Sequence, residues 1–213
     1  MGFERVLDRI REEIEADDLV REKVLPLART AVRNCSESIK MSHRGDFEKA
    51  KKSLAEANSI IIQAKDELLK SEFLMKTHIL DTAYQELAEA ANILSILERG
   101  EITPPVDYDI PSRPYLTGLG DTVGELRRAV LESLREDNVT KAVNLLSSME
   151  NILENLNDFD FPNALVPDLR RKCDVARNLI ERTRGDVTNA VRQTKMIHEL
   201  REFEERMQEK DSS

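Results

Sequence analysis

Apolar residues recur at intervals of three and four along most of this chain. In two segments the interval holds without a gap: Phe47, Ala50, Leu54, Ala57, Ile61, Ala64 and Leu68, then Leu80, Ala83, Leu87, Ala90, Leu94 and Leu97. This spacing places the side chains on one face of an α-helix, where they can pack against neighbouring helices. No segment shows the alternation typical of a strand, so the pattern predicts an all-α fold.

Polar turns and prolines divide the pattern into seven predicted helices. They cover about 3–16, 20–40, 47–68, 80–99, 115–135 and 139–156, with a long last helix from about Val166. Between the second and third lies a turn at 41–46, in which Gly45 suits a helix C-terminus and Asp46 can cap the next helix. We expect one domain over 1–213, a seven-helix bundle of long antiparallel helices, whose residues 196–213 either fray or form an oligomer arm.

Composition supports helices and limits the partners. Trp is absent, aromatic residues make up 4% of the chain, charged residues make up 34%, and the net charge is −9. A surface that is basic all over is therefore excluded, and any nucleic acid must contact a local patch or a lined cavity. Cys35 and Cys173 stand alone in the sequence, which suits core positions in a reducing compartment. With no signal segment and no apolar run of about 18 residues, we expect a cytoplasmic protein without a membrane contact.

Four acidic residues form two pairs at helical spacing. Glu86 and Glu89 are three apart, and Asp121 and Glu125 are four apart, so each pair points to one side of its helix. If the two helices pack side by side, the four carboxylates can converge as an all-oxygen site suited to Mg²⁺ or Mn²⁺. In a chain with 41 acidic residues, however, such pairs also occur on solvated helix faces.

The surroundings of both pairs favour a site. Glu86 and Glu89 interrupt a second apolar register formed by Ile79, Thr82, Ile93 and Ile96. Carboxylates in such a stripe need a cation, a basic partner or a proton, because burying an unpaired charge is costly. Around the second pair, Gly118, Gly120 and Gly124 remove side-chain bulk inside a helix, which indicates a close backbone approach or access for a substrate.

Four blocks, in the same order, resemble the translin and trax family over about residues 5–195. Residues 38–46 (SIKMSHRGD) resemble the family's HRGD turn, and 84–90 (YQELAEA) resemble its QEYVEA motif. Residues 115–128 (YLTGLGDTVGELRR) are similar to YLxGLxDLxGELxR, and 169–177 (LRRKCDVAR) to LRxKxDxxR. The departures are small, with Leu87 and Ala88 in place of the family's aromatic residue and Val.

This resemblance implies a seven-helix bundle that assembles into closed shells, commonly octamers, with RNA held inside. A basic inner surface would then be compatible with an acidic chain. Trax-type subunits of the family are metal-dependent endoribonucleases that use acids at the QExxE and DxxGE positions, whereas translin-type subunits bind RNA and lack part of that set. This chain keeps Glu86, Glu89, Asp121 and Glu125, so the resemblance predicts a trax-like catalytic homo-oligomer in which these four acids are both metal ligands and catalytic residues.

Cations near the matching blocks are the candidates for RNA contact, since binding to a phosphate backbone requires positive charge. They are Lys40, His43, Arg44, Lys76, His78, Arg127 and Arg128. Each of them could equally be an ordinary charge on an exposed helix.

Three other functions are compatible with parts of the sequence. A translin-like shell could bind RNA or single-stranded DNA without cutting it. A structural bundle would account for the long seams and the acidic charge. An all-α di-metal enzyme acting on nucleotides would also use paired helical acids, but the YLTGLGDTVGEL block and the lack of a further ExxE with a matching Asp count against it.

Overall fold

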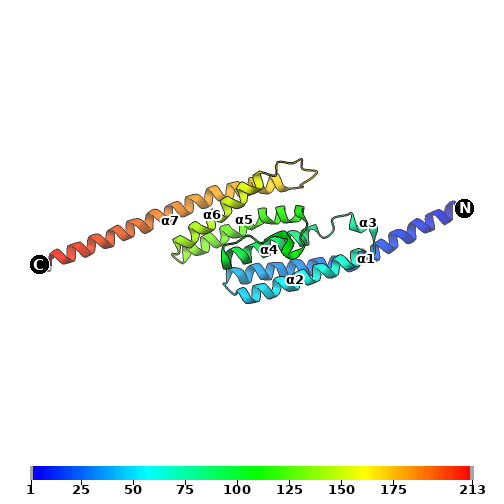
Figure 1. The fold of residues 1–213 in the computed structure, drawn as a ribbon, viewed down its shortest axis with the longest axis horizontal. Helices are drawn as coiled ribbons and strands as arrows, with labels where there is room; N and C mark the ends of the chain where they lie inside the picture. Colours follow the sequence, from blue (N-terminus) through cyan, green and yellow to red (C-terminus); the bar gives the residue numbers. More distant parts are fainter. Residues whose placement is uncertain (1, 212–213) are drawn as a thin grey trace. The chain divides into compact units, whose positions relative to one another are not determined.

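The computed structural model describes the backbone of residues 2–211 and the side chains of residues 2–208. This part of the chain contains seven α-helices and one 3₁₀ turn, and no strand (Figure 1). The elements are α1 (Phe3–His43), α2 (Phe47–Leu68), α3 (Glu72–Met75), α4 (Asp81–Arg99), η1 (Pro105–Tyr108), α5 (Ser112–Arg135), α6 (Val139–Asn157) and α7 (Leu169–Asp211). The all-α prediction is confirmed, and among residues 2–211 no helix has the length and hydropathy of a membrane-spanning segment.

The chain forms two compact units rather than one evenly connected body. The first contains residues 1–122 and 163–169, and the second contains 123–162 and 170–213. The boundary falls within α5, so the first turns of this helix belong to one unit and its later turns to the other. The expectation of a single domain remains a prediction.

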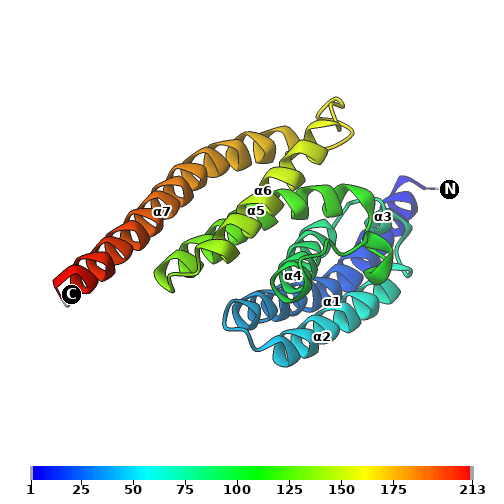
Figure 2. The same ribbon diagram turned by 60° about the vertical axis from the view of Figure 1, so that its left-hand side comes forward.

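In the first unit α1, α2 and α4 pack against one another (Figure 2). The predicted turn joins α1 to α2: Gly45 has φ +73°, and the Asp46 side chain accepts a hydrogen bond from the backbone N–H of Lys49. The core consists of the apolar register of each helix, and Val24, Ala57 and Leu87 are fully buried in it. These packed faces follow the predicted three-and-four spacing.

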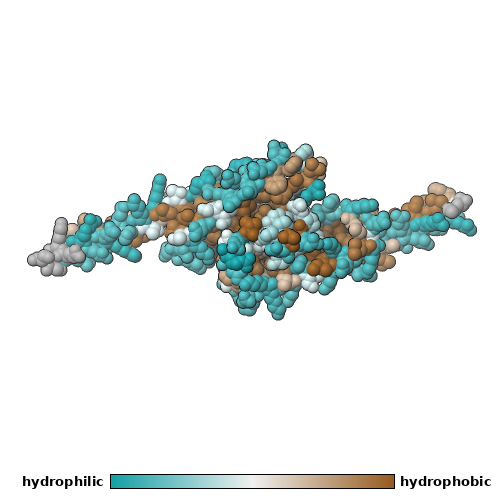
Figure 3. All heavy atoms as spheres, viewed as in Figure 1, coloured by the Kyte–Doolittle hydropathy of each residue, from teal (hydrophilic) through white to brown (hydrophobic). Residues whose placement is uncertain are grey.

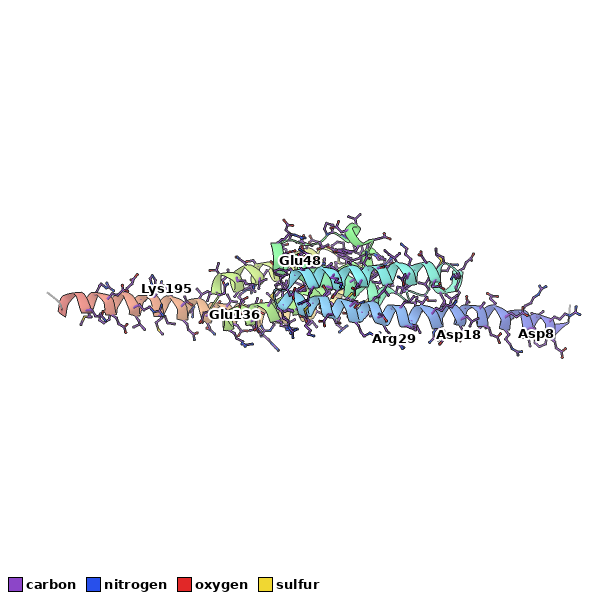
Figure 4. The ribbon with its side chains drawn as sticks, turned by 90° about the horizontal axis from the view of Figure 1, so that it is seen from below. Asp8, Asp18, Arg29, Glu48, Glu136 and Lys195 are labelled. Carbon is purple, nitrogen blue, oxygen red and sulfur yellow. The ribbon has the colours of Figure 1, made fainter. Side chains whose placement is uncertain are left out.

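The break predicted after residue 16 is wrong, because α1 runs without interruption from Phe3 to His43. Asp17 and Asp18 find side-chain partners in the helix surroundings: Asp17 accepts a 2.5 Å hydrogen bond from Ser71, and Asp18 pairs with Arg21 at 3.2 Å. No glycine interrupts this stretch, and α1 also continues through Pro26. The first turns of α1 extend past the end of α2 (Figure 4).

This protruding part of α1 carries an apolar stripe in contact with solvent. Phe3, Leu7, Ile10 and Ile14 are all exposed, and hydrophobic atoms are visible on this part of the helix (Figure 3). Their spacing of four, three and four residues matches a helix face made to be covered. Within the described part of the first unit, all four side chains remain exposed.

In the second unit the later turns of α5 are connected through α6 to α7. Leu126, Val130, Met149 and Ile180 are among its buried side chains. The last helix begins at Leu169 rather than at Val166, because Asp168 takes a left-handed conformation (φ +62°) that ends the preceding turn. Residues 196–211 are helical, residues 212–213 lie outside the described residues, and the arm function of this segment remains a prediction.

Candidate functional site

The site begins on α4, where Glu86 and Glu89 are half-buried among buried neighbours. Leu87, Ala88 and Ala90 are completely inaccessible to solvent, and Ile93 and Ile96 are buried further along the same helix. Of the stripe that these glutamates interrupt, Ile93 and Ile96 are packed, whereas Ile79 is half-buried and Thr82 is exposed, so only its later part is a buried face. Two carboxylates one turn apart are held here at the edge of the core.

The negative charges of both glutamates affect the pKa of the Cys35 thiol on α1. Its side chain is fully buried, and its thiol pKa is raised to about 12, first by burial and then by the negative charges of Glu86 and Glu89. Both carboxylates therefore act on the part of the core where α1 packs on α4. Cys173, the other free thiol, is also buried, and burial raises its pKa as well.

Asp121 on α5 is linked directly to α4. The side-chain amide of Gln85 donates a 2.7 Å hydrogen bond to Oδ2 of Asp121, in a partly buried position. Gln85 immediately precedes Glu86 on α4, so this bond places Asp121 beside the first acidic pair within the first unit.

Gly118 explains how α5 comes so close to α4. A Cβ atom at this position would lie 2.6 Å from the Gln85 carbonyl oxygen and 2.7 Å from Cβ of Ala88. Real side chains do not tolerate such distances, so a glycine is required. Of the two interpretations of these glycines, close backbone approach is the one that applies to Gly118, whereas a Cβ at Gly124 would meet only Cδ1 of Leu179 at 4.0 Å.

Glu125 lies one turn beyond Asp121 on α5, in the second unit. It is half-buried, and Arg128 donates to its Oε2 at 3.5 Å.

The four acids fit a hard divalent cation in kind, because all of them supply carboxylate oxygens. Three of them, Glu86, Glu89 and Asp121, come from helices that are in backbone contact at Gly118. Among the described side chains, no group of three or more His, Cys, Asp or Glu residues is arranged to hold a metal ion. A metal would therefore require rotation of side chains in this group, and Asp121 could keep its bond to Gln85 through Oδ2 while its other oxygen faced the metal.

This chain was compared with family models and with individual proteins. No family model matches it, but individual proteins and solved structures do. An uncharacterized protein of Methanocaldococcus jannaschii is 34% identical over 186 residues, which cover 86% of this chain and 82% of that protein. The structure of Archaeoglobus AfC3PO in complex with duplex RNA matches with a TM-score of 0.79 and 34% identity, over 86% of this chain and 95% of that one. C3PO proteins are of the translin/trax type. The chain belongs to the translin family.

Two further solved structures agree with this assignment. A crystal structure of AfC3PO has a TM-score of 0.77 at 34% identity, over 86% of this chain and 96% of that one. The structure of apo-NeC3PO has the same TM-score and the same coverage of both chains at 22% identity, which supports the fold alone.

The translin-type fold of this chain separates the basic candidates of the first unit into two clusters. Lys40, His43 and Arg44 lie where α1 ends, whereas Lys76 and His78 lie between α3 and α4. The two clusters are at opposite ends of α2, whose 22 residues span about 33 Å. His43 is half-buried, the other four are exposed, and Nδ1 of His78 lies 3.2 Å from Oδ2 of Asp81. A single unit thus presents two separate basic areas rather than one patch.

Arg127 and Arg128, the candidates in the second unit, differ in their environment. Arg127 is half-buried, donates a 2.6 Å hydrogen bond to the Thr183 hydroxyl and pairs with Asp186 at 3.2 Å, so it connects α5 to α7. Arg128 is exposed and pairs with Glu125 on the same helix at 3.5 Å. Arg128 is therefore the more accessible of the two to a phosphate.

Sequence reasoning did not assign a role to two residues near the site. Gln85 stands inside the matching YQELAEA block, but nothing in the sequence marks its amide as a partner for Asp121. Arg113, at the start of α5, donates from Nε to the backbone carbonyl of Leu165 in the loop before α7. Neither contact leaves a periodic signal, since both join segments that are far apart in the sequence.

Proposed function

We propose that this protein is a metal-dependent endoribonuclease of the trax type that encloses RNA in a shell built from its own copies. The observation that carries the proposal is the placement of Glu86 and Glu89 on a packed face of α4, beside the Gln85–Asp121 hydrogen bond to α5. Both glutamate side chains end in carboxylate oxygens, which are the ligands that Mg²⁺ and Mn²⁺ prefer in proteins.

Glu86, Glu89, Asp121 and Glu125 would hold one or two Mg²⁺ or Mn²⁺ ions. When bound, such ions lower the pKa of a water and neutralise charge that develops on a phosphate. Gln85 fixes the orientation of the Asp121 carboxylate through its amide. The packed wall of α4 limits the access of bulk water from the core side.

RNA is the substrate that the family relationship supports. AfC3PO, 34% identical to this chain, has been solved with duplex RNA. Because its net charge is −9, this protein would contact RNA through local cations. Arg44, Lys76 and Arg128 are exposed and could make such contacts.

A homo-oligomer, which we expect to be an octamer from the family resemblance, is supported by the apolar stripe on α1. Phe3, Leu7, Ile10 and Ile14 are exposed within a single chain. Covering them with another copy would remove this apolar surface from water.

A translin-like shell that binds RNA or single-stranded DNA without cutting it is the second candidate. It is favoured by the lack, among the described side chains, of a group of three or more residues arranged to hold a metal. The two functions share their RNA-binding surface and differ in chemistry.

The deciding experiment measures cleavage of an end-labelled single strand and a duplex of RNA, with Mg²⁺ or Mn²⁺ and with EDTA. We expect Asp121→Asn and Glu125→Gln to lower the cleavage rate by about 100-fold or more, because a catalytic metal contributes several kcal/mol. Glu56→Gln, an exposed acid on α2, is the matched control and should cleave normally. Retained RNA binding with no cleavage by the unaltered protein would support the non-catalytic shell.

A further inference from the structure

A cavity of about 460 Å³ opens in the first unit, where α4 and α5 begin. Its walls come from the connection before α4, the first turns of both helices, and the loop at 163–168. Gln85 is part of the wall and is also the donor to Asp121. The cavity therefore lies one side chain away from a carboxylate of the proposed active site.

We propose that this cavity holds one unpaired nucleotide of the RNA, with its nucleobase inside and its phosphate at Arg113. The inference rests on the proposed function for the source of that nucleotide. A volume of about 460 Å³ lies within the range of pockets for small organic ligands. A paired nucleotide could not enter, since its base edge is occupied by the partner strand.

The charges of the wall favour a neutral ligand over a bare phosphate chain. Two basic residues, His78 and Arg113, face two acidic ones, Asp81 and Asp168. With His78 protonated these charges cancel, and with His78 neutral the wall is negative by one charge. A phosphate chain alone gains little electrostatic attraction from a wall without a net positive charge. A nucleobase is polar without being charged.

The wall offers several hydrogen-bond acceptors. One N–H of the Gln85 amide is engaged by Asp121, which leaves the second N–H and the carbonyl oxygen of Gln85 for a ligand. The buried Thr117 hydroxyl has one proton, which it can donate to the carbonyl oxygen of Arg113 or to that of Pro114, and its oxygen can still accept. Together with the carboxylates, these atoms suit a base that carries N–H donors. Guanine, with three such hydrogens on one edge, fits better than uracil, which has one.

Arg113 supplies the place for the phosphate. Its Nε donates to the Leu165 carbonyl, which fixes the guanidinium plane at the edge of the cavity and ties down the loop that forms one wall. The N–H groups of its two terminal nitrogens have the fork geometry that pairs with phosphate oxygens.

The backbone around the cavity is held in an uncommon conformation. Four non-glycine residues among those described have a positive φ, and two of them, His78 at +56° and Asp168 at +62°, line this cavity. Such conformations cost about 1 kcal/mol or more and persist where the surroundings impose them, often at binding sites.

The test fills the cavity. Ala164 lines it from an exposed position, so Ala164→Trp can occupy the space without removing a core contact, and Ala55→Trp on the exposed side of α2 is the matched control.

Binding of GMP, UMP and ribose 5-phosphate is measured in EDTA by saturation-transfer NMR, which reports protons of the base and of the ribose separately. We expect GMP to bind at least about tenfold more tightly than ribose 5-phosphate, with transfer to H8 of the base. Ala164→Trp should reduce GMP affinity by about tenfold or more, and Ala55→Trp should leave it within about twofold.

A second arm identifies the source of the nucleotide. Affinity for a guanine-containing single-stranded RNA hexamer is measured in the Glu125→Gln background in EDTA, and Ala164→Trp should lower it while Ala55→Trp does not. Equal binding of GMP and ribose 5-phosphate, or equal GMP affinity in the two tryptophan variants, would overturn the nucleobase site. An effect of Ala164→Trp on GMP but not on the hexamer would overturn RNA as its source. Because no metal and no cleavage enter either arm, a protein that binds nucleotides here but cuts no RNA would contradict only the proposed function.

Discussion

Gln85 and Asp121 are joined by a 2.7 Å hydrogen bond from the side-chain amide to Oδ2 of the carboxylate, across the contact between α4 and α5. The bond is possible because Gly118, one turn before Asp121, lets the two backbones approach. It limits the rotation of a carboxylate that we propose as a metal ligand. Gln85 is therefore a positioning residue for Asp121.

Replacing Gln85 should weaken metal binding more than it weakens the fold. Partners that orient a ligand typically contribute about 10- to 100-fold to metal affinity. We expect Gln85→Ala to lower Mn²⁺ affinity within that range, measured by electron paramagnetic resonance of free Mn²⁺. Gln63→Ala, at an exposed position of α2, is the control. If Gln85→Ala left the Mn²⁺ affinity unchanged, Asp121 would not be a metal ligand that Gln85 orients.

Gly118→Ala should destabilise the protein although alanine is the better helix former. The new Cβ would lie 2.6 Å from the Gln85 carbonyl oxygen, so α4 and α5 would have to separate. Overpacking of this kind costs about 1–3 kcal/mol, against a gain of about 1 kcal/mol in helix propensity. Gly185→Ala on α7, where nothing lies within 4 Å of the new atom, should gain about 0.5–1 kcal/mol. Urea unfolding of both variants measures the difference, and equal stabilisation of the two would refute the close contact.

The buried thiol of Cys35 should make stability fall at alkaline pH. Its pKa is about 12 in the folded chain, against an ordinary pKa of 9.0 for a cysteine thiol, so the unfolded chain loses this proton first as the pH rises. The stabilising effect is complete below about pH 9 and is lost between about 9 and 12, at up to about 1.4 kcal/mol per pH unit. Unfolding in EDTA at several pH values should show a shallower decline for Cys35→Ala than for the unaltered protein. Parallel declines would contradict the raised pKa.

Much of the site could be predicted because burial leaves a periodic signal. Glu86 and Glu89 interrupt an apolar register, and the structure holds both of them half-buried on that face. The break at Asp17 and Asp18 was predicted wrongly because Ser71, a partner of Asp17, lies 54 residues away in sequence. Helix propensity alone could not anticipate it. The same limit applies to Gln85 and Arg113, whose partners are brought near only by folding.

Arg127 and Arg128 are adjacent in sequence but differ in burial. Replacing each of them in turn should therefore distinguish an effect on stability from an effect on RNA binding. Arg127 is half-buried and bonds Thr183 and Asp186, so Arg127→Met should cost about 1–3 kcal/mol of stability through the lost charged hydrogen bonds. Arg128 is exposed, so Arg128→Met should change stability by about 0.5 kcal/mol or less. If Arg128 contacts an RNA phosphate, its replacement should also reduce the slope of log affinity against log salt by about one.

The two measurements are made on the same pair of variants, with RNA titrations at several salt concentrations below the unfolding temperature of the weaker one. Arg127→Met should keep the salt slope of the unaltered protein, because its guanidinium is committed to α7. The assignment of Arg128 to RNA contact and of Arg127 to the fold would be reversed if Arg127→Met lowered the salt slope and Arg128→Met left it unchanged. That result would mean that RNA displaces the bonds to Thr183 and Asp186, and that the link between α5 and α7 opens when RNA binds.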